Sequence, residues 1–197
     1  MNAIELLLQR QSTSVLASPA PSDVDLASLL EAGMRVPDHA GLKPWHFHVI
    51  TGEGIQRLSN LYVEAITAEL AMNTKDKQQD PLDKEAIEAK LAKTAKMPFR
   101  APMIIVVSTH YVEHKVPKQE QLVAAGCCAH AIQMAAYALG YGAMWRTGNL
   151  AYNDIVKQGL SLEAGNEIAG FLYIGTPTKV ANAKPAKDYQ DKVTYWL

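Results

Sequence analysis

Hydrophobic residues recur at helical spacing in several stretches of the chain, separated by polar or glycine-containing segments. This spacing predicts helices over residues 2–10, 23–32, 55–70, 119–139 and, more briefly, around 152–159. Ser22 is suited to cap the second of these helices, and Gly33 to end it. The segment 119–139 is rich in alanine, so we expect another core helix to pack closely against it, in the same chain or across a dimer.

Three other segments have the patterns of strands. Residues 45–50, WHFHVI, alternate large apolar residues with histidine, as a strand with one dry and one partly polar face would. Residues 103–109, MIIVVST, form a continuous β-branched run, which predicts a central strand buried on both faces. A third strand is predicted over 168–175, IAGFLYIG. Helices and strands are thus mixed along the chain, without an internal repeat.

Residues 71–98 differ in composition from the rest of the chain. They are rich in Lys, Asp, Glu and Gln, and the run DKEAIEAKLAKTAK places charges at helical i to i+4 spacing. We interpret them as a solvated helical excursion from a single domain that spans residues 1–197, since 197 residues lie in the usual range for one domain.

Charge and composition narrow the classes of partner. Lys and Arg number 19 and Asp and Glu 20, so no field of one sign favours nucleic acid or an anionic membrane. The N-terminus has no basic segment followed by a cleavage site, and no stretch approaches 18 apolar residues. We therefore expect a cytoplasmic protein that binds neither nucleic acid nor membrane.

Several common catalytic and binding motifs do not occur. There is no GxGxxG, no GxxxxGK[ST] and no GxSxG, which excludes the usual signatures of dinucleotide folds, P-loops and α/β-hydrolases. Cys127 and Cys128 are adjacent in a helical pattern, and the six histidines do not follow metal-ligand spacing. His110 and His114 are four residues apart, but they follow a predicted strand and are interpreted as part of a solvated loop. We expect no metal site.

Three loci have the chemistry to hold a planar cofactor that bears a phosphate. Arg10 and Ser12, at the end of the first helix, combine a guanidinium with a hydroxyl donor. The loop RVPDHAGLKP adds Arg35 and His39 as a second candidate anion site, with prolines that stiffen its backbone. In GYGAMWRTG, glycines allow close approach to a flat ring, and Arg146 or a backbone N–H could donate to it, while Trp145 fits a core position. Taken singly, the first two loci are better explained as ordinary surface residues beside a polar turn or loop.

Taken together and in this order, these segments resemble the nitroreductase-like flavoproteins. The resemblance rests on the N-terminal RxS turn, the loop and strand RVPDHAGLKPWHFHVI, the segment GYGAMWRTG and the strand that ends in FLYIGTP, and it spans nearly the whole chain. The motifs RxPDH, PWHF and WR[ST]G are most similar to the short bacterial members. The resemblance implies an α+β sandwich with a mostly antiparallel central sheet flanked by helices, and a domain-swapped homodimer with two FMN sites at its interface.

The family also implies which residues hold the cofactor. Its FMN-binding positions correspond, residue by residue, to three groups in this chain: Arg10, Gln11 and Ser12 in the first turn; Arg35 and His39 in a loop that reaches the flavin of the other subunit; and Trp145, Arg146 and Thr147 beside the isoalloxazine ring. Two positions depart from the family pattern near the phosphate, where Gln11 and Val15 replace basic residues. Each lost charge-assisted contact weakens binding by about 1–3 kcal/mol. Lys43 replaces the Gln that commonly precedes Pro-Trp.

The function implied by this resemblance is hydride transfer from NADH or NADPH, through FMN, to a nitroaromatic, a quinone or a similar small electron-poor acceptor. We expect the flavin to carry the chemistry, and we assign no acid-base residue to the protein. Two alternatives stay open at the level of sequence. One is an FMN-binding protein without reductase turnover, and the other is a cofactor-free helical interaction protein, which would explain the alanine-rich helix but not the PWHF and WRTG motifs.

Overall fold

A five-stranded antiparallel sheet forms the centre of the molecule in the computed structural model, which describes residues 2–73, 81–179 and 185–196. β5 (Ile168–Pro177) pairs on one side with β3 (Met103–Thr109) and on the other with β1 (Leu16–Ala17) and β4 (Gly142–Arg146). β2 (Trp45–Thr51) pairs with β3 and is the last strand on this side of the sheet among the described residues. The three strands expected from sequence are therefore confirmed, and β4 joins them from within GYGAMWRTG.

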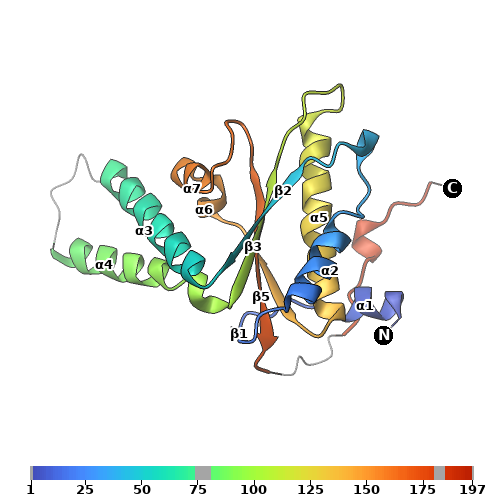
Figure 1. The fold of residues 1–197 in the computed structure, drawn as a ribbon, viewed down its shortest axis with the longest axis horizontal. Helices are drawn as coiled ribbons and strands as arrows, with labels where there is room; N and C mark the ends of the chain where they lie inside the picture. The colour runs from blue at the N-terminus through green and yellow to red at the C-terminus, as the bar shows by residue number, and fades with distance from the viewer. Residues whose placement is uncertain (1, 74–80, 180–184, 197) are drawn as a thin grey trace.

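Helices cover both faces of this sheet (Figure 1). α2 (Asp23–Gly33) and α5 (Lys118–Ala138) lie on one side, and the short α1 (Ala3–Gln9) lies beside the C-terminal end of α5. α3 (Glu53–Asn73), α6 (Asn149–Tyr152) and α7 (Asp154–Gly159) lie on the other side, where α4 (Pro81–Ala95) packs against α3. Short 3₁₀ turns occur at His39–Gly41, Pro98–Arg100 and Gln190–Lys192. The expected α+β sandwich with an antiparallel sheet is confirmed.

The central strand divides the hydrophobic core into two clusters. All seven residues of β3 are buried, and successive side chains alternate between the faces. Ile105 and Val107 belong to the cluster under α2 and α5, whereas Ile104 and Val106 belong to the cluster under α3, α6 and α7. A continuous β-branched run is what such a strand requires, because neither of its faces meets water.

The alanine-rich helix has the close neighbour that its composition predicts. α2 packs on α5, and a Cβ added at Gly33 would lie 2.9 Å from the Cys128 sulfur. Ser22 caps α2, with its side chain accepting from the backbone N–H of Asp25, as its position before the helix predicts. Small side chains on both helices therefore set their separation.

Three expected helices differ in detail from the observed ones. The single helix around 152–159 is two short helices, because Asn153 interrupts the first and caps the second by accepting from the backbone N–H groups of Ile155 and Val156. Three apolar residues of α1, Ile4, Leu7 and Leu8, are exposed within the chain, whereas Leu6 is half-buried. Within the charged segment 71–98, residues 81–95 form the helix α4. Lys90 of α4 forms an ion pair with Glu69 of α3, with 3.7 Å between Nζ and Oε1. Residues 74–80 of this segment lie outside the described residues.

Within the described ranges, no helix has both the length and the apolar character needed to cross a membrane.

Candidate functional site

A backbone hydrogen bond joins the first candidate locus to the third. Arg10 is the C-cap of α1, and the chain then runs through Gln11 and Ser12 to Thr13, whose N–H donates to the carbonyl of Ala143 in β4 at 2.9 Å. Gly142 permits this approach, since a Cβ there would lie 3.0 Å from the side chain of Thr13. The turn with the candidate phosphate ligands thus lies beside the strand that carries Trp145 and Arg146.

Arg146 lines a hollow of about 320 Å³ on the face of the sheet that α3 covers. The other lining residues come from α3, the segment before β3, β4, α6 and β5, and they are Tyr62, Met97, Met144, Trp145, Thr147, Gly148, Leu150, Phe171 and Tyr173. The guanidinium carbon of Arg146 lies 5.3 Å from the ring centroid of Tyr173, and its Nε is buried without a hydrogen-bond partner. Among the described residues, no carboxylate forms an ion pair with Arg146. A half-buried guanidinium with a buried and unpaired N–H is suited to bind a polar or anionic ligand.

Trp145 occupies a different environment from its neighbour in sequence. Its side chain packs against the cluster under α2 and α5, and its Nε1 donates to the carbonyl of Ala169 at 3.1 Å. Gly170 leaves room for the indole, because a Cβ there would lie 1.9 Å from Nε1. The ring of Trp145 therefore acts as part of the core, as its position in the sequence also suggested. Its predicted contact with a cofactor stays a prediction.

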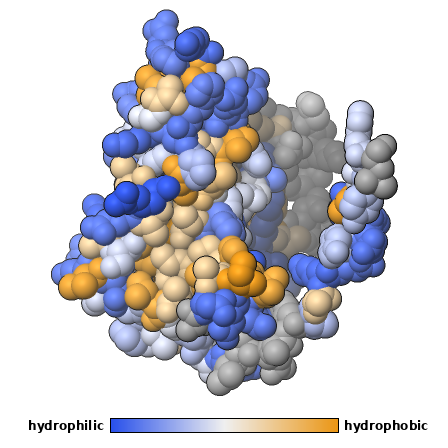
Figure 2. Space-filling model, turned by 90° about the vertical axis from the view of Figure 1, so that its right-hand side faces the viewer, coloured by the Kyte–Doolittle hydropathy of each residue, from blue (hydrophilic) through white to orange (hydrophobic). Residues whose placement is uncertain are grey.

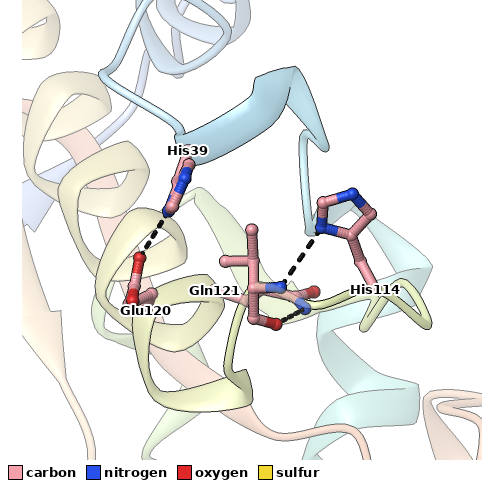
Figure 3. A network of polar contacts seen from close by, with 5 residues as sticks. His39, His114, Glu120 and Gln121 are labelled. Carbon is pink, nitrogen blue, oxygen red and sulfur yellow. Dashed lines mark hydrogen bonds and ion pairs between the residues drawn. The ribbon is translucent and has the colours of Figure 1, made fainter.

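The second candidate locus lies in the loop between α2 and β2, apart from the other two. The exposed ring of His39 contacts Glu120 at the start of α5, with 2.8 Å between Nδ1 and Oε2 (Figure 3). Asp38 accepts from the backbone N–H of Lys43, and this contact shapes the loop at the position that departs from the family pattern. Arg35 is exposed near the end of α2. His39 lines a different hollow from the one that Arg146 lines, so the two residues do not share a site within one chain.

Close to His39, a buried glutamine fixes the loop between β3 and α5 (Figure 3). Gln121 accepts from the N–H of Val112 at 2.9 Å and donates to the carbonyls of Val112 and Val116. His114 accepts from the N–H of Val116 at 3.2 Å, and both His110 and His114 are exposed. The interpretation of this histidine pair as part of a solvated loop is confirmed.

The other hollows and reactive side chains of the described residues do not form a second candidate site. A hollow of about 770 Å³ lies between β2, α3 and α7, but none of the sequence-predicted site residues lines it. In the part of the chain that the structure describes, no group of three or more His, Cys, Asp and Glu residues is arranged to hold a metal ion. Burial raises the pKa of the Cys128 thiol to about 12, so this cysteine is held as an unreactive thiol.

Some residues of the hollow are not evident as site residues in the sequence. Tyr62 belongs to the amphipathic pattern of α3, and Phe171 and Tyr173 are two residues apart in β5, which places both on the same face of the sheet. The two aromatic residues in FLYIG, spaced two positions apart, were the one sequence feature that could have indicated this part of the site. Its meaning depends on the pairing of β5 with β4, which brings Arg146 opposite Phe171.

Comparison with known proteins identifies the family. The nitroreductase family model matches residues 7–176, nearly the whole described chain. "Putative NAD(P)H nitroreductase YdjA" of Escherichia coli K12 is 41% identical over 198 residues, covering 100% of both chains. "Putative NAD(P)H nitroreductase" of Haemophilus influenzae is 31% identical, covering 99% of this chain and 100% of the relative.

Solved structures share the fold at lower sequence identity. A nitroreductase-like family protein from Bacillus cereus superimposes with a TM-score of 0.78 at 21% identity, covering 100% of this chain and 96% of that one. A variant of the FMN and NADPH-dependent nitroreductase NfnB from Sphigopyxis sp. strain HMH gives a TM-score of 0.71 at 19% identity, covering 100% and 99%. The family match, the full-length relatives and the fold agree, and the chain belongs to the nitroreductase family of oxidoreductases.

Proposed function

We propose that this chain is an FMN-dependent reductase that takes hydride from NADH or NADPH and passes it to small electron-poor acceptors such as nitroaromatics or quinones. The observation that carries the proposal is the hydrogen bond from Thr13 to Ala143, which brings the Arg10–Ser12 turn alongside the strand of Arg146. Support comes from relatives named as NAD(P)H nitroreductases and from a structural neighbour named as dependent on FMN and NADPH.

The donor groups in this part of the molecule fit the chemistry of FMN. Arg10 and Ser12 offer a guanidinium and a hydroxyl to a phosphate, and Gln11 adds an amide donor to the same turn. Arg146 offers a half-buried guanidinium to the polar edge of a ring, and the next residue, Thr147, is exposed. Bound FMN would supply the hydride chemistry itself, which no amino-acid side chain can provide.

The role of this chain is to bind and orient the cofactor and to limit the access of water. The hollow beside Arg146 is walled by aromatic and methionine side chains, which present an apolar surface to a planar ring. Arg146 is the only sequence-predicted cation among the residues that line this hollow. We assign no residue of the chain to proton transfer.

We further propose that the working form is a homodimer. The apolar residues of α1 and the aromatic residues near the C-terminus are exposed within one chain, which favours their burial by a second copy. Arg35 and His39 lie away from the hollow of their own chain, which is consistent with a contribution to the cofactor site of the other subunit.

The visible spectrum of the purified protein, before and after anaerobic addition of NADH or NADPH, tests this function. We expect a yellow protein whose flavin absorbance is bleached by at least one of the two nicotinamides and restored by a nitroaromatic or a quinone. A yellow protein that neither donor bleaches would indicate a flavin-binding protein without turnover. A colourless protein that cannot be reconstituted with FMN would contradict the proposal as a whole.

A further inference from the structure

The position of the Arg146 guanidinium over the Tyr173 ring suggests a further role within the proposed flavin site. The guanidinium carbon lies 5.3 Å from the centroid of the Tyr173 ring, and the two residues are diagonal neighbours on one face of β4 and β5, since Tyr173 is opposite Met144. A guanidinium that lies over an aromatic ring keeps its in-plane N–H donors available for a ligand. We infer that Tyr173 is a positioning residue, whose ring holds the Arg146 guanidinium ready to donate to the ring of bound FMN.

Tyr173 is itself held in place by its surroundings. It is 2% exposed and belongs to the core cluster under α3. Its hydroxyl interacts with that of Tyr62, and the ring of Tyr62 in turn meets Phe171 edge to face, with centroids 5.6 Å apart. Burial raises the pKa of Tyr173, so the phenol stays neutral. The ring under Arg146 is therefore buried and uncharged.

The described part of the chain gives Arg146 no stronger partner than this ring. Its Nε is buried and unpaired, and none of the ion pairs among residues 2–73, 81–179 and 185–196 includes it. A partly buried guanidinium without a carboxylate partner can adopt several side-chain conformations. Tyr173 compensates part of the lost solvation of Arg146 and limits its conformations before the cofactor binds.

The inference rests on the proposed function, and three variants separate the two. Tyr173→Leu removes the ring, Tyr173→Phe keeps the ring without the hydroxyl, and Leu172→Val alters a buried neighbour whose side chain belongs to the opposite core cluster. For each variant, FMN affinity is measured by fluorescence titration, the midpoint potential of bound FMN by equilibrium dye titration, and folding by circular dichroism.

In Tyr173→Leu, we expect FMN affinity to fall about tenfold, which corresponds to the loss of one favourable cation–π contact. If the donor favours the reduced ring by the same tenfold factor, the potential falls by about 30 mV. Tyr173→Phe should restore both values, because the ring face is what the guanidinium uses. Leu172→Val should lose thermal stability without a change in potential.

Two results would overturn the inference while leaving the proposed function intact. One is a folded Tyr173→Leu protein with the potential and the FMN affinity of the wild type. The other is a fall in potential in Tyr173→Phe as large as that in Tyr173→Leu, which would assign the effect to the hydroxyl. Failure of the wild-type protein to bind FMN would contradict the proposed function itself.

Discussion

At the scale of single residues, two neighbours in β4 have different roles, one in the core and one in the proposed binding site. Trp145 packs into the core cluster under α2 and α5 and donates to Ala169, while Arg146 belongs to the opposite face and stacks on Tyr173. The separation follows from the period of a strand, in which successive side chains point to opposite faces. Substitution of Trp145 should therefore act mainly on stability, and substitution of Arg146 mainly on ligand binding.

The phosphate assignment is tested at Arg10. Replacing Arg10 by Ala should weaken FMN binding by about 1–3 kcal/mol, since it removes a charge-assisted donor. Fluorescence titration of the apoprotein with FMN measures the change. Arg57→Ala removes an exposed arginine from α3, outside the proposed site, and serves as the control. Unchanged affinity in Arg10→Ala would show that the phosphate binds elsewhere.

His48 gives the protein a predictable dependence on pH. Desolvation lowers the pKa of His48 from its ordinary value of 6.5, proximity to His46 lowers it further, and the carbonyl of Leu160 opposes the change in part. Below pH 6.5 the unfolded chain therefore binds a proton more readily than the folded one. The contribution of His48 to stability is present above pH 6.5 and is lost as the pH falls through the folded pKa.

Melting temperatures between pH 5 and pH 8 test this linkage. His48→Gln cannot titrate but keeps an amide donor, so it should lose less stability on acidification than the wild type does. Equal slopes in the wild type and His48→Gln would mean that another group controls the acid dependence.

At the scale of elements, the contact between β4 and β5 depends on the absence of one side chain. The indole of Trp145 occupies the space where a Cβ of residue 170 would lie, at 1.9 Å from Nε1. Gly142 plays a similar part on β4, where the chain after α1 passes close by. Two glycines in two strands thus allow the turn of Arg10 and the strand of Arg146 to come together.

Gly170→Ala should destabilise the protein by about 1–3 kcal/mol, since the indole must leave its rotamer or the strands must separate. Thermal unfolding followed by circular dichroism measures the loss. Gly126→Ala lies in α5, where among the described residues nothing beyond the adjacent residues and the helix's own backbone comes within 4 Å of the added Cβ. It should stabilise the protein by about 0.5–1 kcal/mol because alanine favours a helix. A neutral effect of Gly170→Ala would show that the close contact relaxes without cost.

At the scale of the whole molecule, one side of a single chain leaves large apolar residues uncovered. Figure 2 looks onto the side of α1, α2 and α5 and shows hydrophobic residues gathered between hydrophilic ones. The exposed apolar residues of these helices and of the C-terminal segment are Ile4, Leu7, Leu8, Val24, Val123, Tyr189, Val193, Tyr195 and Trp196. Surfaces of this kind are usually buried against a partner.

A charge on α1 tests the proposed homodimer. Leu8 is 73% exposed within the chain, so Leu8→Glu should not disturb the fold of one chain but should disfavour burial of this helix in a dimer. Light scattering after size exclusion should give twice 21.5 kDa for the wild type and a smaller mass, with weaker FMN binding, for the variant. Met72→Glu, on α3 across the sheet (Figure 1), is the matched control. A monomeric wild type that binds FMN fully would contradict the dimer.

Much of the architecture followed from local pattern alone. The β-branched run of 103–109 predicted a strand buried on both faces, the alternation of WHFHVI predicted β2, and Ser22 marked the start of α2, which ends at Gly33. These features depend on residues close together in the chain, whose spacing and capping chemistry are visible in the sequence. The family resemblance was confirmed in the same way, because it rests on ordered motifs.

Only the tertiary structure decided how the candidate residues are arranged. The sequence did not show that Thr13 would bond to Ala143, that Trp145 and Arg146 would face different core clusters, or that Tyr173 would lie under the guanidinium. Each of these contacts joins residues 25 or more positions apart, or depends on the register in which two strands pair. Local spacing carries no information on that register, since a slip of one residue would exchange the two faces of the strand.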